Sequence, residues 1–337
     1  MILVTGGTGL LGSHLLYKLV SDGLTIRALK RKSSDIEFTR KVFSYYSEDY
    51  NKLFEKIQWV DGDIIDVYSL EDVFEKIDYV YHCAAIVSFD ASAKKIMFDT
   101  NLSGTANIVN VALNHKIKKL CHVSSIAALG RSSNSSVISE STGWVTSKQN
   151  SLYAISKYNA EREVWRGINE GLNAVIVNPS IILGPGDWKN DSSKIFTLVN
   201  NGLKFYTNGV NAYVDVIDVV NSMVLLMNSE VSAERFIIAS ENYSYRDLLN
   251  TIAKYLKKPL PKYHANSFTS ALAWRLEKAR SLLTNSKPLI TKQIAKTASN
   301  KSFYSNEKFQ QKYNYTYLSV EESVKRICEI LIKQKSH

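Results

Sequence analysis

"LVTGGTGLLGSHLLYKLV", residues 3–20, places four glycines within seven positions, between an apolar run and a helix-like pattern. Residues 2–4 are apolar and predict a short buried strand. After the glycines, leucines recur at the spacing of one helix face, at Leu11, Leu15, Leu16 and Leu19. The stretch therefore predicts a strand, a tight glycine turn and a helix, in that order.

The glycine turn has the form of a phosphate-binding loop. Gly7, Gly9 and Gly12 spell G-x-G-x-x-G, and Gly6, Gly9 and Gly12 spell G-x-x-G-x-x-G. Glycine lets the backbone approach a ligand closely, and the free N–H groups and dipole of the next helix attract an anion. A plain turn between strand and helix would also use glycines. The flanking strand and helix, however, are the context that a dinucleotide site requires.

The bulk composition is that of an ordinary globular chain. Its 337 residues suffice for one large or two unequal domains. No apolar stretch is long enough to span a bilayer and no basic leader precedes the first strand, so we expect a cytoplasmic protein. The cysteines are few and widely spaced, at Cys83, Cys121 and Cys328. They favour a reducing compartment and predict neither a disulfide framework nor a metal site.

The net charge of +10 is concentrated in one part of the chain. Residues 251–337 hold 17 Lys and Arg against 5 Asp and Glu, so the remainder is close to neutral. The basic residues alternate with apolar ones at helical spacing instead of forming a tail. We interpret them as a solvated face and expect no nucleic-acid partner, while attraction to an anionic substrate or a membrane surface remains the alternative.

Strand and helix patterns alternate through the first half of the chain. Strands are predicted at 2–4, 24–29, 57–60, 78–82, 119–123 and 174–178. Amphipathic helical stretches are predicted at 12–22, 68–76, 93–114 and 151–170. This alternation predicts an α/β fold, a doubly wound parallel sheet with helices on both faces. The segment 33–56 is expected to be a helical insertion.

After Pro179 the alternation loosens and a smaller, mostly helical C-terminal substrate domain is predicted. Residues 212–220 are strand-like and lead into a helix through 229, and 235–240 predict another strand. We expect a dinucleotide-binding domain over 1–178, with 211–240 returning to it. The substrate domain would then comprise 179–210 and 241–337.

The end of the second predicted strand bears on the choice of cofactor. Dinucleotide folds that prefer NAD place a carboxylate there, whereas a nearby Arg accommodates the 2′-phosphate of NADP. Here the strand ends in Lys30, Arg31 and Lys32. Arg31 can stack on adenine and form a forked contact with a phosphate. An ordinary basic loop would look the same, but we predict NADP, with NAD as the alternative.

The sequence "YAISK" places Tyr153 and Lys157 four residues apart, on one face of a helix. A neighbouring ammonium stabilises a phenolate, so we expect Lys157 to bring the pKa of Tyr153 toward the working range. Ser124 and Ser125 follow a predicted strand, and a hydroxyl there could bind a substrate carbonyl. Alone, the Tyr–Lys spacing is common on surface helices, so its value depends on the other motifs.

Taken together, the motifs resemble the extended short-chain dehydrogenase/reductase superfamily. They follow in order along almost the whole chain: "TGGTGLLG" (5–12), "GDI" (62–64), "HCAA" (82–85), "TNLSGTANIV" (100–109), "HVSS" (122–125), "YAISK" (153–157), "NPSIILGPGD" (178–187) and "YVDVIDVV" (213–220). The resemblance implies a Rossmann domain that binds NAD(P), a C-terminal substrate domain and a Ser–Tyr–Lys triad. In the family the hydroxyl lies five residues before the glycine that closes its loop. Counting back from Gly130 gives Ser125, with Ser124 in reserve.

The resemblance also implies which residues contact the cofactor: Gly6, Thr8, Gly9, Leu10, Leu11, Gly12, Arg31, Lys32, Asp63, Ile64, Cys83, Ala84, Ala85, Tyr153, Lys157, Pro179 and Ser180. Asp63 and Ile64 would hold the adenine, and Pro179 and Ser180 would touch the nicotinamide end. Other polar residues in the motifs are expected to be structural: Asn101 tying helix to strand, His82 and His122 buried in strands, and Asp215 and Asp218 organising a loop or capping a helix.

Departures from the family patterns favour one branch of it. Dehydratases place an acidic pair after the catalytic hydroxyl, but Ile126 and Ala127 stand here. Many epimerases clamp the substrate diphosphate with an Arg where this chain has Asn211. The C-terminal run instead resembles the dihydroflavonol-reductase and 3β-hydroxysteroid-dehydrogenase branch. It includes a helical apolar face that would cover a hydrophobic substrate or simply pack into the core: Leu272, Leu276, Ala279, Leu282 and Leu283.

We therefore predict an NADP-dependent reductase of a ketone or aldehyde on a small, mainly apolar molecule. Two alternatives stay open: an NAD-dependent epimerase of nucleotide sugars, and a non-catalytic NADP-binding sensor. The intact Tyr153–Lys157 pair argues against a sensor, which needs no proton donor. A homodimer and peripheral membrane contact are both left open by the sequence.

Overall fold

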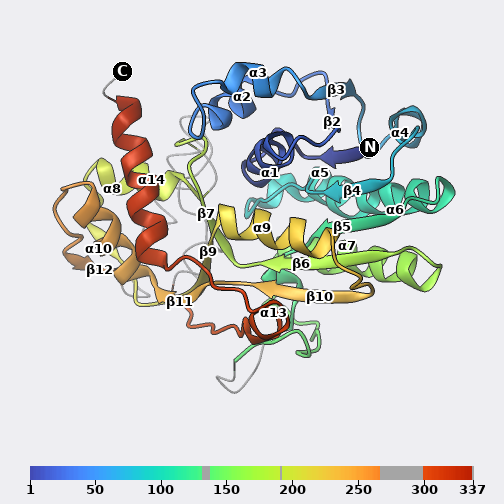
Figure 1. Ribbon diagram of the computed structural model, residues 1–337. Helices are drawn as coiled ribbons and strands as arrows, with labels where there is room; N and C mark the ends of the chain where they lie inside the picture. The colour runs from blue at the N-terminus through green and yellow to red at the C-terminus, as the bar shows by residue number, and fades with distance from the viewer. Residues whose placement is uncertain (131–136, 190–191, 266–298, 336–337) are drawn as a thin grey trace.

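The computed structural model describes residues 1–130, 137–189, 192–265 and 299–335. Within these residues the main element is a seven-stranded sheet in the order β10-β6-β5-β4-β1-β2-β3, in which all pairs are parallel (Figure 1). The strands are β1 (Ile2–Thr5), β2 (Ile26–Lys30), β3 (Gln58–Asp61), β4 (Tyr79–His82), β5 (Lys119–Val123), β6 (Ala174–Pro179) and β10 (Glu234–Ile238). The order reverses between β1 and β4, which is where such sheets bind ligands.

Helices cover both faces of this sheet, as predicted. α1 (Leu10–Ser21) and α9 (Val216–Met227) pack on one face, and α4 (Val67–Val73), α6 (Gly104–Asn114) and α7 (Leu152–Asn169) pack on the other. Alternate strand residues supply the two cores: Val4 faces α1 and α9, whereas Leu3 faces the other helices. The doubly wound Rossmann fold is therefore confirmed.

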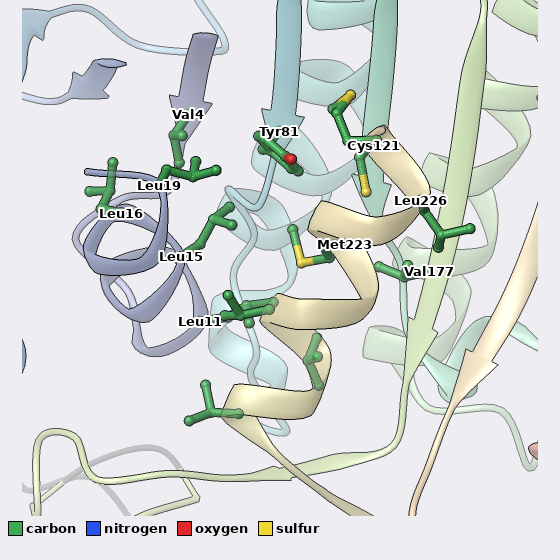
Figure 2. Close-up of a cluster of buried hydrophobic side chains, with 14 of the residues drawn as sticks. Val4, Leu11, Leu15, Leu16, Leu19, Tyr81, Cys121, Val177, Met223 and Leu226 are labelled. Carbon is green, nitrogen blue, oxygen red and sulfur yellow. The ribbon is translucent and has the colours of Figure 1, made fainter. Parts of the chain in front are cut away.

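The leucines of the opening stretch hold α1 against the sheet. Leu15, Leu16 and Leu19 are fully buried and, with Tyr81 of β4, lie in one cluster (Figure 2). From α9, Met223 completes this contact. Burying each such side chain contributes about 1.5–3 kcal/mol. This packing fixes the start of α1 at the carboxyl end of β1.

Two of the predicted helical segments of the first half, 33–56 and 93–114, are interrupted. The insertion forms α2 (Glu37–Phe43) and α3 (Tyr50–Phe54). The stretch expected at 93–114 divides into α5 (Lys94–Phe98), a π turn over Asp99–Ser103 and α6. π turns are frequent at functional sites, and this one contains the buried Asn101.

The rest of the chain packs around a separate hydrophobic cluster that includes Tyr213, Leu248 and Val324. Its elements are β7 (Ile181–Leu183), β9 (Val210–Asp215) and β11 (Glu241–Ser244) in a three-stranded sheet, β8 (Phe205–Tyr206) with β12 (Tyr263–His264), and α8 (Lys194–Asn200), α10 (Tyr245–Tyr255) and α14 (Val320–Lys335). The helix α13 (Glu307–Tyr313) instead packs on β10, where its Phe309 belongs to the core of the seven-stranded sheet. None of the helices in the described ranges is long and apolar enough to cross a membrane.

The segment expected to return to the first domain is shared between the two sheets. The strand β9 pairs with β7 and β11, whereas β10 is a strand of the seven-stranded sheet and α9 packs on the face of that sheet. The strand ends at Asp215, earlier than the strand-like pattern through 220 indicated. The Asp215 carboxylate caps α9 by accepting from the Ile217 N–H at 2.8 Å. The domain boundaries stay predictions, and the apolar face at 272–283 lies outside the described residues.

Candidate active site

The glycine turn is closed on one side by the protein and open on the other. Gly6 has φ +73°, and a Cβ there would lie 2.6 Å from the Ala84 nitrogen. A Cβ on Gly12 would lie 2.1 Å from the Gly6 oxygen, so the turn and the start of α1 are in direct backbone contact. At Gly9, by contrast, a Cβ would meet only the Gly6 oxygen at 3.4 Å. The exposed side of Gly9 therefore leaves room for a ligand.

The first turn of α1 supplies hydrogen-bond donors at this open side. α1 begins at Leu10, and its N-cap Gly9 has no side chain to satisfy the first N–H groups. Ser13 is the first residue whose N–H bonds back, to the Gly9 oxygen at 2.9 Å. The N–H groups of Leu10, Leu11 and Gly12 are thus available to an anion at the positive end of the helix dipole. This donor set fits the diphosphate of a dinucleotide.

The basic end of β2 contains one paired and two exposed cations. Lys30 forms an ion pair with Asp61 of the neighbouring β3. Arg31 and Lys32 are exposed beyond the strand. The Arg31 backbone N–H donates to the Ser34 hydroxyl at 3.1 Å, but neither the Arg31 nor the Lys32 side chain forms a hydrogen bond or ion pair in the described ranges. The structure therefore places the Asp61 carboxylate near the end of β2, which the sequence of that strand did not reveal. Lys30 neutralises its charge.

The expected adenine residues lie at the end of β3, close to α6. Asp63 accepts from the Ile65 N–H at 3.2 Å, and its own N–H donates to Ser69. Ile64 is buried, and a Cβ on Gly104 would approach its side chain to 2.5 Å. The glycine at the start of α6 therefore allows the loop after β3 to sit directly on that helix.

A chain of hydrogen bonds connects the ends of β1 and β4 to the π turn. His82 bonds Thr5 at 2.7 Å and Thr105 at 3.0 Å. Asn101 holds both the N–H and the carbonyl of Ile86, at 2.7 and 2.9 Å, and donates to Ser156 of α7 at 3.0 Å. Asn101 therefore has a structural role, as expected, but it ties the loop after β4 to α7 instead of tying a helix to a strand.

The two histidines of the central strands are buried, as expected. His82 and His122 are each 1% exposed. Burial lowers the pKa of His82 to about 3 and holds the pKa of His122 well below its ordinary value. Both rings are therefore neutral at physiological pH. The described residues contain no cluster of His, Cys, Asp or Glu placed to hold a metal ion.

The two candidate serines after β5 have different partners. Ser124 is buried and donates to the Glu161 carboxylate at 2.6 Å. Ser125 instead accepts from the Ala127 N–H at 3.1 Å, and its hydroxyl lies near enough to the Tyr153 phenol to lower the pKa of that phenol. The geometry thus puts Ser125 beside Tyr153 and directs Ser124 away from it.

Lys157 lies one turn further along α7 and is 2% exposed. Its ammonium donates to the Val123 carbonyl at 2.8 Å. Burial lowers the pKa of Lys157 to about 8, and the negative charge of Glu161 opposes this shift. The pKa of Tyr153 is raised by burial, which outweighs the lowering by Ser125. The expected direction for Tyr153 was therefore wrong for this structure, because the sequence does not reveal how deeply the phenol is buried.

The carboxyl ends of β4 and β6 complete the cluster. Cys83 and Ala84 follow β4 and reach back to β1: the Cys83 N–H donates to the Thr5 carbonyl at 3.1 Å. Burial raises the pKa of the Cys83 thiol to about 12, so it remains protonated. Pro179 ends β6, and the hydroxyl of the buried Ser180 has no hydrogen-bond partner within the described residues. An unpaired buried hydroxyl at this edge fits a ligand contact.

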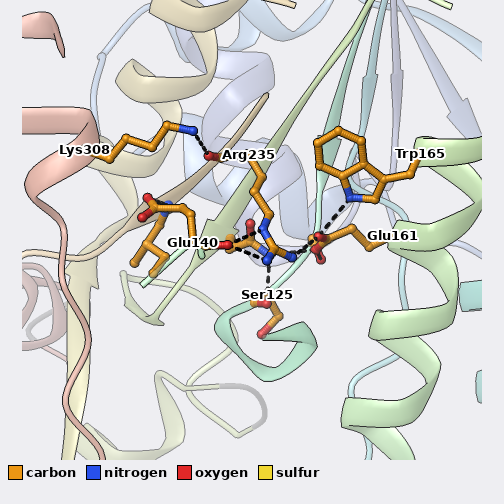
Figure 3. A network of polar contacts seen from close by, with 9 residues as sticks. Ser125, Glu140, Glu161, Trp165, Arg235 and Lys308 are labelled. Atoms are coloured by element: carbon orange, nitrogen blue, oxygen red, sulfur yellow. Dashed lines mark hydrogen bonds and ion pairs between the residues drawn. The ribbon is translucent and has the colours of Figure 1, made fainter. Parts of the chain in front are cut away.

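A network around Glu161 was not anticipated from the sequence (Figure 3). The Glu161 carboxylate accepts from Ser124, from Asn178 at 2.8 Å and from Trp165 at 3.3 Å, and it pairs with Arg235 of β10 at 2.9 Å. The available signal was its spacing, since residues 153, 157 and 161 follow one helix face. Apart from Trp165 on the same helix, its partners could not be found from the sequence, because they come from three other segments.

Asp215 and Asp218 have the structural roles expected for them. Besides capping α9, Asp215 accepts hydrogen bonds from Arg326 of α14. Its two carboxylate oxygens lie 2.7 and 2.8 Å from Nη2 of Arg326. Asp218 accepts from the Tyr315 hydroxyl at 2.8 Å and the Leu318 N–H at 2.9 Å. Asn211, in β9, is buried and contacts Tyr245.

A Rossmann sheet, a glycine turn at a helix N-terminus and a Ser–Tyr–Lys cluster at the same sheet edge define an NAD(P)-dependent oxidoreductase-type enzyme. Residues 2–239 match the NAD dependent epimerase/dehydratase family, and the chain belongs to it. The family lies within the extended short-chain dehydrogenases/reductases, as the sequence motifs indicated.

Curated relatives are similar over most of their length. A putative dihydroflavonol 4-reductase of Synechocystis is 27% identical over 95% of this chain and 91% of its own. The sterol demethylase protein B of Methylococcus capsulatus is 26% identical over 77% and 76%. Among solved structures, UDP-glucose 4-epimerase of Thermotoga maritima with UDP-glucose has a TM-score of 0.78 over 99% of both chains at 21% identity, a likeness of fold.

Proposed function

We propose that the protein is an NADP-dependent reductase of a ketone or aldehyde on a small, mainly apolar molecule. One observation carries the proposal: the Ser125 hydroxyl lies beside the Tyr153 phenol, whose pKa it lowers, and the buried Lys157 follows one turn further along the same helix. Two hydroxyl donors that converge beside a cation suit a carbonyl oxygen that gains negative charge. The bound nicotinamide would supply the hydride.

The chain's own residues would divide the remaining work. Ser125 would orient the carbonyl and stabilise its developing charge. Tyr153 would give the proton, because its phenol lies beside that same oxygen position. Lys157, buried and held at the Val123 carbonyl, would favour the phenolate that remains. The N–H groups of Leu10, Leu11 and Gly12 would hold the cofactor diphosphate.

The surroundings of Tyr153 support an apolar substrate. Phe89, from the loop after β4, makes an edge contact with the Tyr153 ring, with 5.8 Å between the ring centroids, and it remains 39% exposed. Val87 of the same loop is also exposed. Apolar walls with a few polar anchors are typical of small-molecule sites. The relatives include a putative dihydroflavonol 4-reductase and cinnamoyl-CoA reductases, whose names agree with a ring-bearing carbonyl compound.

The epimerase alternative is favoured by the likeness of fold to UDP-glucose 4-epimerases. A nucleotide sugar carries two phosphates that need cationic, preferably forked, partners. At the position of the epimerase clamp this chain has the buried Asn211 instead of an arginine. Arg326 donates to Asp215 through Nη2 only. The missing arginine at the clamp position favours the reductase. A sensor role remains the non-catalytic alternative. A cytoplasmic location, homodimer formation and membrane contact remain predictions.

A thermal-shift panel with NADPH present separates the substrate classes. We expect compact aromatic or alicyclic ketones to raise the melting temperature and UDP- or dTDP-sugars to have little effect, because the site offers apolar walls instead of a diphosphate clamp. Free UDP serves as a control for nucleotide binding unrelated to a sugar. Stabilisation by a nucleotide sugar, with none by any hydrophobic carbonyl compound, would favour the epimerase.

A further inference from the structure

Behind the Ser125–Tyr153–Lys157 cluster lies a carboxylate that the proposed chemistry does not use. Glu161 is 2% exposed and is the next residue on the helix face that presents Tyr153 and Lys157. A buried carboxylate must be paired or multiply hydrogen-bonded to remain charged. Glu161 meets both conditions, since one of its oxygens bonds Ser124 and Asn178 and the other bonds Trp165 and Arg235.

The partners of Glu161 come from the elements that form the floor of the site. Ser124 directly precedes Ser125 at the end of β5, and Asn178 also donates to the Ser125 carbonyl at 3.1 Å. Arg235 of β10 donates to the Glu140 carbonyl at 3.0 Å as well as to Glu161 (Figure 3). The network therefore fixes the backbone on which Ser125 stands relative to α7.

Glu161 is also placed to act on Lys157 electrostatically. The groups that face Lys157 are His82 and Cys83 from β4 and its end, His122 from β5, and Tyr153 and Glu161 from α7. Both histidines and the thiol are neutral near pH 7, because burial moves their pKa values away from that range. Glu161 is thus the member of this group whose negative charge favours the Lys157 ammonium.

We propose that Glu161 is a positioning residue for the reaction: its buried carboxylate fixes the Ser124–Ser125 turn and keeps Lys157 charged beside Tyr153. Arg235 balances the carboxylate from the opposite side through its 2.9 Å ion pair. The inference rests on the proposed function for its kinetic consequence, but the coupling of Glu161 to Lys157 is a property of the folded chain and is measurable without turnover.

The kinetic test is the pH profile of kcat/KM for Glu161→Gln. Removing the negative charge of Glu161 lowers the pKa of Lys157. The alkaline limb of the profile, where Lys157 loses its proton, should therefore move to lower pH by about one unit. Glu163→Gln is the matched control: it lies on the same helix but pairs with Arg166 at the surface. A merely structural Glu161 would give a loss of rate that is equal at every pH, and that result would overturn the proposal.

A second readout needs no activity. Folding depresses the pKa of Lys157 from 10.5 to about 8, so the unfolded chain holds more protons between these values. The contribution of Lys157 to the free energy of unfolding must therefore rise with pH across that window. It is obtained as the difference between proteins with Lys157 and with Lys157→Met. In the Glu161→Gln background we expect the rise to begin at lower pH, whereas an unmoved window would contradict the coupling.

If Glu161→Gln does not fold, Arg235→Gln tests the same coupling in the opposite direction. Without the balancing guanidinium, Glu161 acts more strongly on Lys157, and both the alkaline limb and the stability window should move to higher pH. Unmoved values in this variant would overturn the inference. Should the reductase proposal itself fail, the stability measurement still reports on Glu161 and Lys157, so the two failures are distinguishable.

Discussion

Tyr153→Phe should reduce turnover on an accepted carbonyl substrate by roughly 10²–10⁴-fold, the contribution expected of a positioned general acid. The change deletes one oxygen from a ring that Phe89 contacts at 5.8 Å, so the packing of the site should survive. Cofactor binding should change little, because the glycine turn and Arg31 are untouched. Steady-state kinetics and a fluorescence titration with NADPH measure the two quantities on the same preparation.

Tyr158→Phe is the matched control for this variant. Tyr158 lies on the same helix, but its ring stacks on Trp144 at 4.3 Å outside the cluster. It should therefore retain the wild-type rate. A Tyr153→Phe protein that keeps more than about a tenth of the wild-type rate would remove the phenol from the role of proton donor.

Arg31→Ala should erase most of a preference for NADPH over NADH. Arg31 is exposed beyond β2, where the ribose end of the cofactor is expected. A charge-assisted contact with the 2′-phosphate contributes roughly 1–3 kcal/mol, or about 5- to 150-fold in affinity. NADH carries no such phosphate, so its affinity should stay nearly constant. Fluorescence titrations of both cofactors against both proteins give the four dissociation constants.

Lys56→Ala controls for the general effect of removing one positive charge, since Lys56 is exposed between α3 and β3. It should lower the two affinities slightly and equally. Equal affinity of the wild-type protein for NADPH and NADH would contradict the assignment of NADP as the cofactor, whatever the variant does.

The features predictable from sequence are those that depend on local pattern. The apolar strands, the leucine face of α1 and the glycine turn are all encoded by residues close together in the chain, and the structure has them where they were expected. The sequence predicted the end of β9 less accurately. The strand-like pattern predicted for 212–220 continues past Asp215, and only the cap contact with Ile217 shows where the helix begins.

The remaining features depend on contacts between distant segments and on burial. Glu161 meets Arg235 and Asn178 only after α7 has packed against β6 and β10. The pairing of Lys30 with Asp61 likewise requires β2 beside β3. The pKa of Tyr153 was expected to fall because a cation lies four residues away, yet burial raises it. Desolvation is set by the whole fold, and spacing in the sequence does not reveal it.

The reductase proposal is tested most directly by following the hydride. The protein is incubated with a ring-bearing ketone and NADPH that carries deuterium at the reactive carbon of the nicotinamide, and the products are analysed by mass spectrometry. The account predicts an alcohol that contains the deuterium, with one NADPH consumed for each alcohol formed. Epimerisation of a UDP-sugar without net consumption of the cofactor, and no deuterated alcohol from any carbonyl compound, would contradict it.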